Sequence, residues 1–296
     1  MKAPVFDYRA PKSLGEATAI LRDAGPDGRV LAGGQSLMPM MNMRIVAPQV
    51  LVDINRIEEL ARLEVDGGTL RVGALVRHVD ILHSPLVRDG WPLMSEATTY
   101  VAHPAIRNRG TTCGSVAHND PAAEHPSVLL TLGGSVVVAS AEGRRELKAE
   151  DFLQGLMTTA LEPGEMIAEL RYPPVRPGTG WAFVEFSRRL GDFAMGGAAA
   201  LLTLRHGVCE EARLTLVGMG EGPVRATAAE ALLAGRQIDD ASAPELFEAA
   251  AQLARGAVDP TEDVHAGSGY RRHLAGVMTR RALAAALARS RGEHHA

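Results

Sequence analysis

Cysteine is nearly absent from this sequence of 296 residues, in which only Cys113 and Cys209 occur. A disulfide framework needs several cysteines, and a thiolate-bound iron–sulfur cluster usually needs four. The chain alone can therefore build neither structure. Any cluster of that kind would have to be bound by another chain.

Aromatic residues and clusters of basic residues are also scarce. Phe, Trp and Tyr make up 4% of the chain, and the formal net charge is −4 at pH 7. Nucleic-acid binding needs clustered Lys and Arg and often aromatic stacking surfaces, so we exclude it. Two arginine pairs, Arg271-Arg272 and Arg280-Arg281, are interpreted as the solvated face of a helix.

Long apolar runs are missing as well. No segment approaches the roughly 18 apolar residues of a membrane-spanning helix. Residues 1–8 lack the apolar region of a secretory signal. We therefore expect a cytoplasmic protein without a transmembrane segment.

The chain exceeds the size that one hydrophobic core usually serves, so we expect more than one packed part. The pattern of apolar residues predicts two kinds of architecture along the chain. A helix at 13–24, with Ser13 as its N-cap, and strands at 29–32 and 50–54 predict a β-α-β unit. Further on, the sequence predicts a strand at 69–74, helices at 79–82 and 92–100, and a hairpin of 135–139 with 145–147. The prolines within 173–178 mark a linker.

Beyond the linker, strands at 181–186, 197–205 and 213–218 predict an antiparallel sheet. Helices are expected at 224–233, 244–255 and 269–289, the last capped by Ser268 and packed on its own sheet. The fold class is therefore α/β and α+β. We predict three segments, at residues 1–55, 56–177 and 178–296.

Two glycine-containing segments, which we expect to be loops, suggest a ligand site. The first follows a predicted strand and comprises Val30, Leu31, Ala32, Gly33, Gly34, Gln35, Ser36 and Leu37; the second contains Thr111, Thr112, Cys113, Gly114 and Ser115. We call them the first and second cradles. Glycine lets backbone N–H groups approach an anion, so two cradles predict one large ligand with a diphosphate. Downstream, Asp120 and Glu124 could accept hydrogen bonds from ribose or ribityl hydroxyls.

Other kinds of site find little support. The histidines at positions 78, 83, 103, 118 and 125 lack metal-ligand spacing, so no metal is expected. Gly114-Ser115 lacks the second glycine of a nucleophile elbow. Cys113 is either a buried small residue or a thiol with a redox role or a covalent link to a cofactor.

Both cradles, together with residues 101–124 and the segment Ser187-Arg188-Arg189-Leu190-Gly191-Asp192-Phe193-Ala194, resemble the FAD-binding subunit of the molybdenum hydroxylases, the family of carbon monoxide dehydrogenase and xanthine dehydrogenase. The resemblance implies the two-subdomain FAD-binding fold of the PCMH/vanillyl-alcohol-oxidase type, followed by an antiparallel sheet with a helical bundle. It implies non-covalent FAD, bound by the residues of both cradles and by Val101, Asp120, Glu124, Leu161, Asp192 and Phe193. Phe193 and Val101 would pack on the flavin ring, and Glu124 would contact the adenosine side. The residues alone also allow Phe193 a place in the core of the antiparallel sheet. Cys113 replaces the glycine that is usual in the family, which puts the local backbone angle in doubt.

The resemblance also implies partners: a large subunit with a molybdopterin cofactor and a small subunit with two [2Fe-2S] clusters, as a dimer of heterotrimers. In that assembly the chain would pass electrons from the clusters through FAD to an external acceptor. Two alternatives stay open from the sequence: a self-sufficient FAD-dependent oxidase or reductase, and a nucleotide-binding scaffold without a redox role. The sequence names neither substrate nor acceptor, and leaves membrane association of the complex open.

Overall fold

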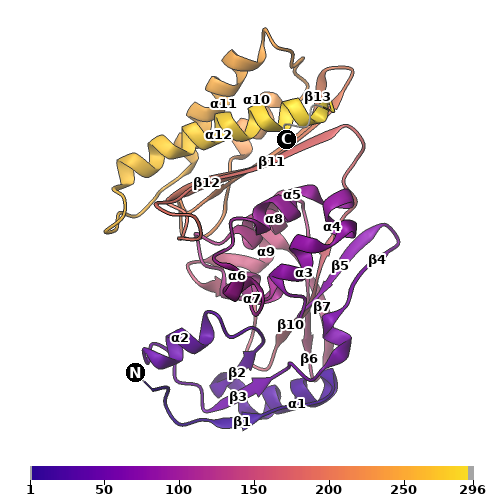
Figure 1. The fold of residues 1–296 in the computed structure, drawn as a ribbon, viewed down its shortest axis with the longest axis vertical. Helices are drawn as coiled ribbons and strands as arrows, with labels where there is room; N and C mark the ends of the chain where they lie inside the picture. The colour runs from indigo at the N-terminus through magenta and orange to yellow at the C-terminus, as the bar shows by residue number, and fades with distance from the viewer. Residues whose placement is uncertain (1, 293–296) are drawn as a thin grey trace.

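A computed structural model describes residues 2–292. Three sheets follow one another along the chain, and helices lie between and around them (Figure 1). The first sheet lies at the N-terminal end of the elongated molecule, and the third lies at the opposite end beneath the C-terminal helices.

The first sheet is parallel, with strand order β1-β3-β2. Its elements are β1 (Asp7–Arg9), α1 (Leu14–Ala24), the 3₁₀ turn η1 (Gly25–Asp27), β2 (Gly28–Leu31), α2 (Leu37–Asn42) and β3 (Val50–Asp53). The predicted β-α-β unit is confirmed, and the Ser13 side chain caps α1 by accepting from the Glu16 N–H at 3.2 Å. The prediction missed β1 because all three of its residues are exposed.

The second sheet is antiparallel, with order β4-β5-β10-β6-β7. Its strands are β4 (Leu63–Asp66), β5 (Thr69–Gly73), β6 (Ser135–Ser140), β7 (Gly143–Lys148) and β10 (Met166–Tyr172). The predicted strand at 69–74 and the hairpin of β6 with β7 are confirmed. The sequence analysis missed β4 and the central strand β10.

Short helices and turns connect these strands. They are η2 (Glu58–Ala61), α3 (His78–His83), α4 (Pro85–Gly90), α5 (Pro92–Thr98), α6 (Pro104–Arg107), α7 (Thr112–His118), α8 (Glu124–Thr131) and α9 (Ala149–Phe152), with a small hairpin of β8 (Leu153–Gly155) and β9 (Thr158–Thr159). Helices near 79–82 and 92–100 were predicted and are present as α3 and α5. The buried faces of α5, α7 and α8 join the core of the second sheet.

The third sheet is antiparallel, as predicted, with order β11-β12-β13-β14. It comprises β11 (Thr179–Phe186), β12 (Gly196–Arg205), β13 (Val208–Val217) and β14 (Val224–Arg225), followed by α10 (Thr227–Leu233), α11 (Ala243–Ala257) and α12 (Ser268–Ser290). The predicted helix at 224–233 begins too early, because Val224 and Arg225 pair with β13 as a strand. Ser268 is the first residue of α12 rather than its cap, since Gly267 occupies the N-cap position.

The third sheet separates two apolar cores. Along β12, Ala198, Ala200 and Leu202 face the core under α10–α12, whereas Ala199 faces the core shared with α5 and α8. This alternation follows from the two-residue period of a strand. The C-terminal helices thus cover one face of the sheet, and the core that includes α5 and α8 covers the other (Figure 1).

The solvated-face interpretation of the arginine pairs is wrong for Arg271. Its side chain is buried against the strands, and its Nη1 donates to the Met195 carbonyl at 2.9 Å and to the Gly218 carbonyl at 3.0 Å. Arg272 and Arg280 are on the surface, where they pair with Asp259 and Glu248. Two arginines that are adjacent in the sequence of a helix project in different directions, so one can be buried while the other is exposed.

Candidate FAD site

The first cradle lies in the turn between β2 and α2. Val30 and Leu31 end the strand, Ala32 to Ser36 form the turn, and Leu37 begins α2. Gly34 has φ of 71°, a left-handed conformation that favours glycine. Within residues 2–292, the N–H groups of Gly34, Gln35 and Ser36 have no hydrogen-bond acceptor. Backbone donors of this kind suit an anion, so the first cradle fits a diphosphate group.

The second cradle is not the loop that the sequence suggested. Residues Thr112–His118 form α7, and Thr111 caps it by accepting from the Gly114 N–H at 3.0 Å. The Thr112 N–H is also used, because it donates to the Val76 carbonyl at 3.2 Å. A Cβ on Gly114 would lie 2.7 Å from Thr111 Oγ1, so a larger residue here would disturb the cap.

The first cradle contacts the backbone that leads into the second cradle. A Cβ placed on Gly33 would lie 2.4 Å from the Arg109 carbonyl oxygen and 2.7 Å from Gly110 Cα. Both atoms belong to the backbone that leads into Thr111. Only glycine at position 33 permits this approach, so segments almost eighty residues apart in sequence form one surface.

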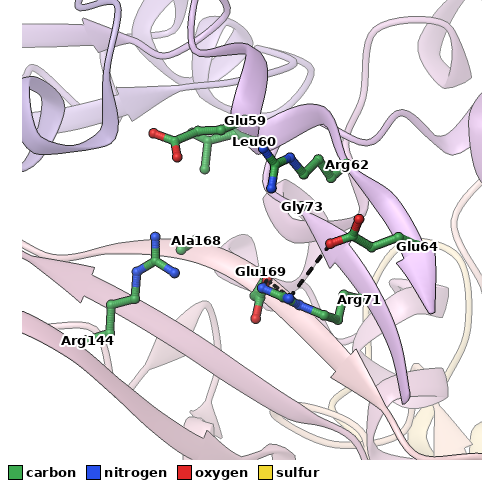
Figure 2. A pocket seen from close by; sticks show the side chains of 9 residues that line it. All are labelled: Glu59, Leu60, Arg62, Glu64, Arg71, Gly73, Arg144, Ala168 and Glu169. Carbon is green, nitrogen blue, oxygen red and sulfur yellow. Dashed lines mark hydrogen bonds and ion pairs between the residues drawn. The ribbon is translucent and has the colours of Figure 1, made fainter. Parts of the chain in front are cut away.

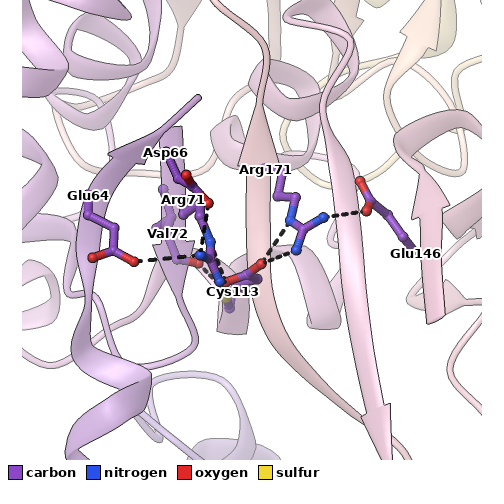
Figure 3. Close-up of polar contacts among 8 residues, drawn as sticks. Glu64, Asp66, Arg71, Val72, Cys113, Glu146 and Arg171 are labelled. Atoms are coloured by element: carbon purple, nitrogen blue, oxygen red, sulfur yellow. Dashed lines mark hydrogen bonds and ion pairs between the residues drawn. The ribbon is translucent and has the colours of Figure 1, made fainter. Parts of the chain in front are cut away.

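Cys113 points away from this surface. Its thiol is buried below the second sheet, and Sγ donates to the Val72 carbonyl at 3.5 Å (Figure 3). Burial raises the pKa of the thiol, which keeps it protonated and unreactive. Of the two interpretations of Cys113, the structure supports the buried small residue, and its backbone is the part available to a ligand.

Figure 3 also shows the ion pairs on the open side of the same sheet. Arg71 donates to Glu169 at 2.7 Å, and Arg171 bridges Glu169 and Glu146. These pairs hold neighbouring strands together, and none of the residues was predicted to bind the ligand.

Glu124 begins α8 beside a second acidic residue that the sequence analysis missed, Glu185 of β11. Burial raises the pKa of Glu124 to about 7. Burial and the nearby Glu124 raise the pKa of Glu185 to about 9, and Glu185 Oε2 has no hydrogen-bond partner within the described residues. Asp120 differs, because its Oδ1 accepts from the Ala122 N–H at 2.9 Å in a local turn. The structure therefore brings together two carboxyl groups, at the start of α8 and on β11, whose pKa values burial raises.

The loop between β11 and β12 carries Asp192 and Phe193. Phe193 is 74% exposed, so its alternative interpretation as a residue of the sheet core is wrong. Gly191 packs on the segment after Val101: a Cβ there would lie 2.9 Å from the Ala102 carbonyl oxygen. The loop is thus held against residues 101–103, which precede the second cradle, and Val101 itself is buried. Leu161 is half-buried against the core of the second sheet.

A histidine pair supports the second cradle from below. His78 Nδ1 and His125 Nε2 lie 3.0 Å apart in a buried, stacked arrangement. Burial lowers the pKa of His78 to about 4 and lowers that of His125 well below its usual value, so both rings are neutral at pH 7. The sequence analysis considered these histidines only as metal ligands. Within residues 2–292, no group of three or more His, Cys, Asp or Glu side chains could hold a metal ion.

A pocket elsewhere on the second sheet is unrelated to the cradles (Figure 2). It lies between η2 and the strands β4, β5, β7 and β10, and is lined by charged side chains that include Arg62, Arg144 and Glu59. None of the residues predicted to bind the ligand lines it. Its three arginines face three glutamates, so it shows no preference for a charged ligand.

Comparison with known proteins gives the class of the chain. Residues 4–175 match the FAD binding domain in molybdopterin dehydrogenase, and residues 181–286 match the CO dehydrogenase flavoprotein C-terminal domain. The first match contains both cradles, and the second contains the loop with Phe193. The chain thus has the flavin-binding fold that the resemblance implied, followed by the antiparallel sheet with its helices.

Individual relatives agree along the whole chain. The 6-hydroxypseudooxynicotine dehydrogenase complex subunit alpha of Paenarthrobacter nicotinovorans is 42% identical over 98% of this chain and 97% of its own length. The carbon monoxide dehydrogenase medium chain of Hydrogenophaga pseudoflava is 38% identical over 98% and 99%. A solved structure of carbon monoxide dehydrogenase from that organism, which lacks the Mo-pyranopterin moiety, superposes with a TM-score of 0.94 at 40% identity, covering 98% of this chain and 99% of that one. The chain belongs to the family of FAD subunits of the molybdenum hydroxylases, which are oxidoreductases.

Proposed function

We propose that the chain binds one FAD non-covalently between its segments 1–55 and 56–177, and that the segment 178–296 presents Phe193 to the flavin ring. The observation that carries this proposal is the backbone contact of Gly33 with Arg109 and Gly110, which joins two anion-binding segments into one surface. A dinucleotide is long enough to use both. Bound FAD supplies the redox chemistry, and the protein supplies orientation, shielding and electrostatics.

Each group of predicted residues has a defined part in this proposal. The amides of Gly34, Gln35 and Ser36 donate to the diphosphate, while Val30, Leu31, Ala32 and Leu37 hold the turn in place. From the second cradle, the backbone N–H of Cys113 completes the diphosphate site, while Thr111, Thr112, Gly114 and Ser115 hold the first turn of α7 in place through their own hydrogen bonds. Asp120 and Glu124 accept from hydroxyls of the ligand, and Val101, Leu161, Asp192 and Phe193 surround the ring. The free amides and the exposed Phe193 side chain support these assignments.

We further propose that this FAD is the exit point of a longer electron path. A small subunit with two [2Fe-2S] clusters would deliver electrons from a molybdopterin subunit, and the FAD would pass them to an external acceptor. The assembly would be a dimer of heterotrimers in the cytoplasm. Two observations support this: the relatives are named as subunits of dehydrogenase complexes, and both cysteines of this chain are buried and free. No helix in residues 2–292 has the length and apolarity to cross a membrane.

Purification of the chain followed by acid precipitation tests the cofactor. We expect about one FAD per chain in the supernatant. Colour that stays with the pellet would refute non-covalent binding, FMN in the supernatant would refute the dinucleotide, and a colourless protein without affinity for FAD would favour the scaffold alternative.

Anaerobic visible spectra test the electron path. We expect aldehydes, N-heterocycles and carbon monoxide to leave the flavin of the isolated chain oxidised, because the chain has no cluster or molybdenum site of its own. Dithionite, as a positive control, should reduce it. One of the substrates should bleach the flavin only after both partners are added. Bleaching of the isolated chain by such a substrate would instead favour the self-sufficient flavoenzyme.

A further inference from the structure

A polar bridge connects the two cradles beside the contact of Gly33. Asn55, two residues after β3, donates from Nδ2 to the Ala32 carbonyl of the first cradle at 2.9 Å. Its Oδ1 accepts from Arg77 Nη2 at 2.5 Å. Arg77 Nη1 donates in turn to the carbonyl of Arg109, which lies two residues before Thr111. One guanidinium and one amide therefore link the backbones of both cradles.

The backbone around Arg77 is attached to the second cradle as well. Arg77 forms an isolated β-bridge with Thr111, and the His78 N–H donates to the Gly110 carbonyl at 3.0 Å. Any shift of Arg77 would thus move the start of α7. Because Asn55 lies only two residues after β3, its hydrogen bonds couple the position of the first sheet to that of the second cradle.

Two guanidinium groups, of Arg77 and Arg109, and two carboxylates, of Asp53 and Asp80, meet at this junction. Burial and the neighbouring Arg109 guanidinium lower the pKa of Arg77, although Asp80 and Asp53 act in the opposite direction. Both carboxylates are already engaged: Asp80 accepts from the Arg77 N–H at 2.9 Å, and Asp53 accepts from the Tyr8 hydroxyl at 2.6 Å and from Asn55. Two guanidinium groups that repel one another beside anion-binding amides would be stabilised by a diphosphate.

We propose that Arg77 is a positioning residue for the dinucleotide, which sets the spacing of the two cradles through Asn55 and Arg109 and places a positive charge behind the diphosphate. This inference rests on the proposed FAD function. It assigns a role to a residue outside both cradles, and it explains how a site without the lysine of a P-loop neutralises its ligand.

Titration of FAD into deflavinated protein, followed by quenching of flavin fluorescence, measures the effect. Loss of one charged hydrogen-bonding group should raise the Kd of Arg77→Gln by about tenfold to a hundredfold. Arg77→Lys keeps the charge but loses the planar guanidinium group that bonds Asn55 and the Arg109 carbonyl at the same time. Its Kd should therefore lie between those of the wild type and Arg77→Gln. Arg62→Gln, at an exposed arginine of the unrelated pocket, is the matched control and should bind as the wild type does.

Two further measurements separate positioning from general structural damage. The ratio of the Kd values of Arg77→Gln and wild type should shrink at high salt, because screening weakens the charge contribution. Asn55→Ala keeps the charge and breaks the bridge, so it should also weaken binding, and its effect should be less than additive with Arg77→Gln. Circular dichroism and thermal unfolding of each deflavinated variant check that it is folded, and Arg77→Lys with Asn55→Ala provide the test if Arg77→Gln is not.

The possible outcomes are distinct. Wild-type FAD affinity in Arg77→Gln, or an equal loss in Arg62→Gln, would overturn the inference and leave the FAD site intact. If Arg77→Gln is unfolded, wild-type affinity in both Arg77→Lys and Asn55→Ala would likewise overturn it. Additive effects of Arg77→Gln and Asn55→Ala would refute the bridge. A wild-type chain without affinity for FAD would refute the proposed function itself.

Discussion

Replacement of Gly33 by alanine tests whether contact between the cradles creates the FAD site. The new Cβ would lie 2.4 Å from the Arg109 carbonyl oxygen, whereas ordinary contacts begin at 3.4 Å, so the backbones must separate by about 3.4 − 2.4 = 1.0 Å. Such overpacking costs roughly 1–3 kcal/mol of stability. The shift also misaligns donors to the diphosphate, and each charge-assisted hydrogen bond lost costs roughly 1.5–3 kcal/mol. We therefore expect the Kd for FAD to rise about 10- to 100-fold for each such bond.

The assay is the same FAD titration, combined with thermal unfolding of the deflavinated protein. Gly15→Ala is the matched control, because Gly15 lies in α1 with nothing within 4 Å of its Cβ position. That variant should be more stable by about 0.5–1 kcal/mol and should bind FAD normally. Gly33→Ala protein that binds FAD with wild-type affinity would refute the argument that the close approach matters to the ligand.

Three further predictions concern groups around the site. The pKa of His78 is lowered from 6.5 to about 4, so as the pH falls the unfolded chain binds this proton before the folded chain does. The free energy of unfolding, measured in urea, should therefore fall by about 3 kcal/mol between pH 6.5 and 4. His78→Asn should flatten this pH dependence, and an unchanged slope would contradict the prediction. The pKa of Glu185 is raised to about 9, so its burial lowers the stability of the fold as the pH rises above 4.5. Glu185→Gln should therefore raise the Tm at pH 8 and have little effect at pH 4. An equal change in Tm at both pH values would count against this explanation. Phe193→Ala should leave stability within about 0.5 kcal/mol, because the ring is exposed, and should alter the flavin's reduction potential or its reoxidation rate in stopped-flow; wild-type values of both would remove Phe193 from the flavin site.

Local sequence patterns were sufficient to predict those elements that are stabilised by residues close to one another in the sequence. The cap and apolar stripe of α1 and the turn between β6 and β7 are examples, since both depend on neighbouring residues. The central strand β10 was missed because Glu169 and Arg171 interrupt its apolar pattern. Their charges are balanced by Arg71 and Glu146 on other strands, which no local pattern reveals.

In the candidate site, too, the local sequence predicts some features, whereas others depend on residues far away in the sequence. Glycine in the first cradle indicated a close approach, and the structure identifies the approaching group as the Arg109 carbonyl, some seventy residues away. The second cradle was predicted as a loop from its glycine and small residues, and Thr, Cys, Gly and Ser are also weak helix formers. A Thr111 cap and the anchoring of Thr112 to Val76 override that preference. Glu185 could have been noticed as a carboxylate at an inward-facing strand position, since Phe183 on the same face is buried.

The position of the Phe193 loop relative to the second cradle depends on the C-terminal helix α12. Its buried Arg271 holds the carbonyls of Met195 and Gly218, and the Met195 N–H closes the base of the loop on the Phe186 carbonyl at 2.8 Å. The Gly218 N–H donates to the Pro121 carbonyl at 2.8 Å, in the segment that connects α7 with α8. One guanidinium is therefore bonded to the carbonyl before β12 and to the carbonyl after β13, and its Nη2 donates to Asp263 at 2.7 Å. Since loss of these partners would leave a buried cation unsatisfied, the loop and the second cradle are expected to keep their relation even when the exposed side chains around them change.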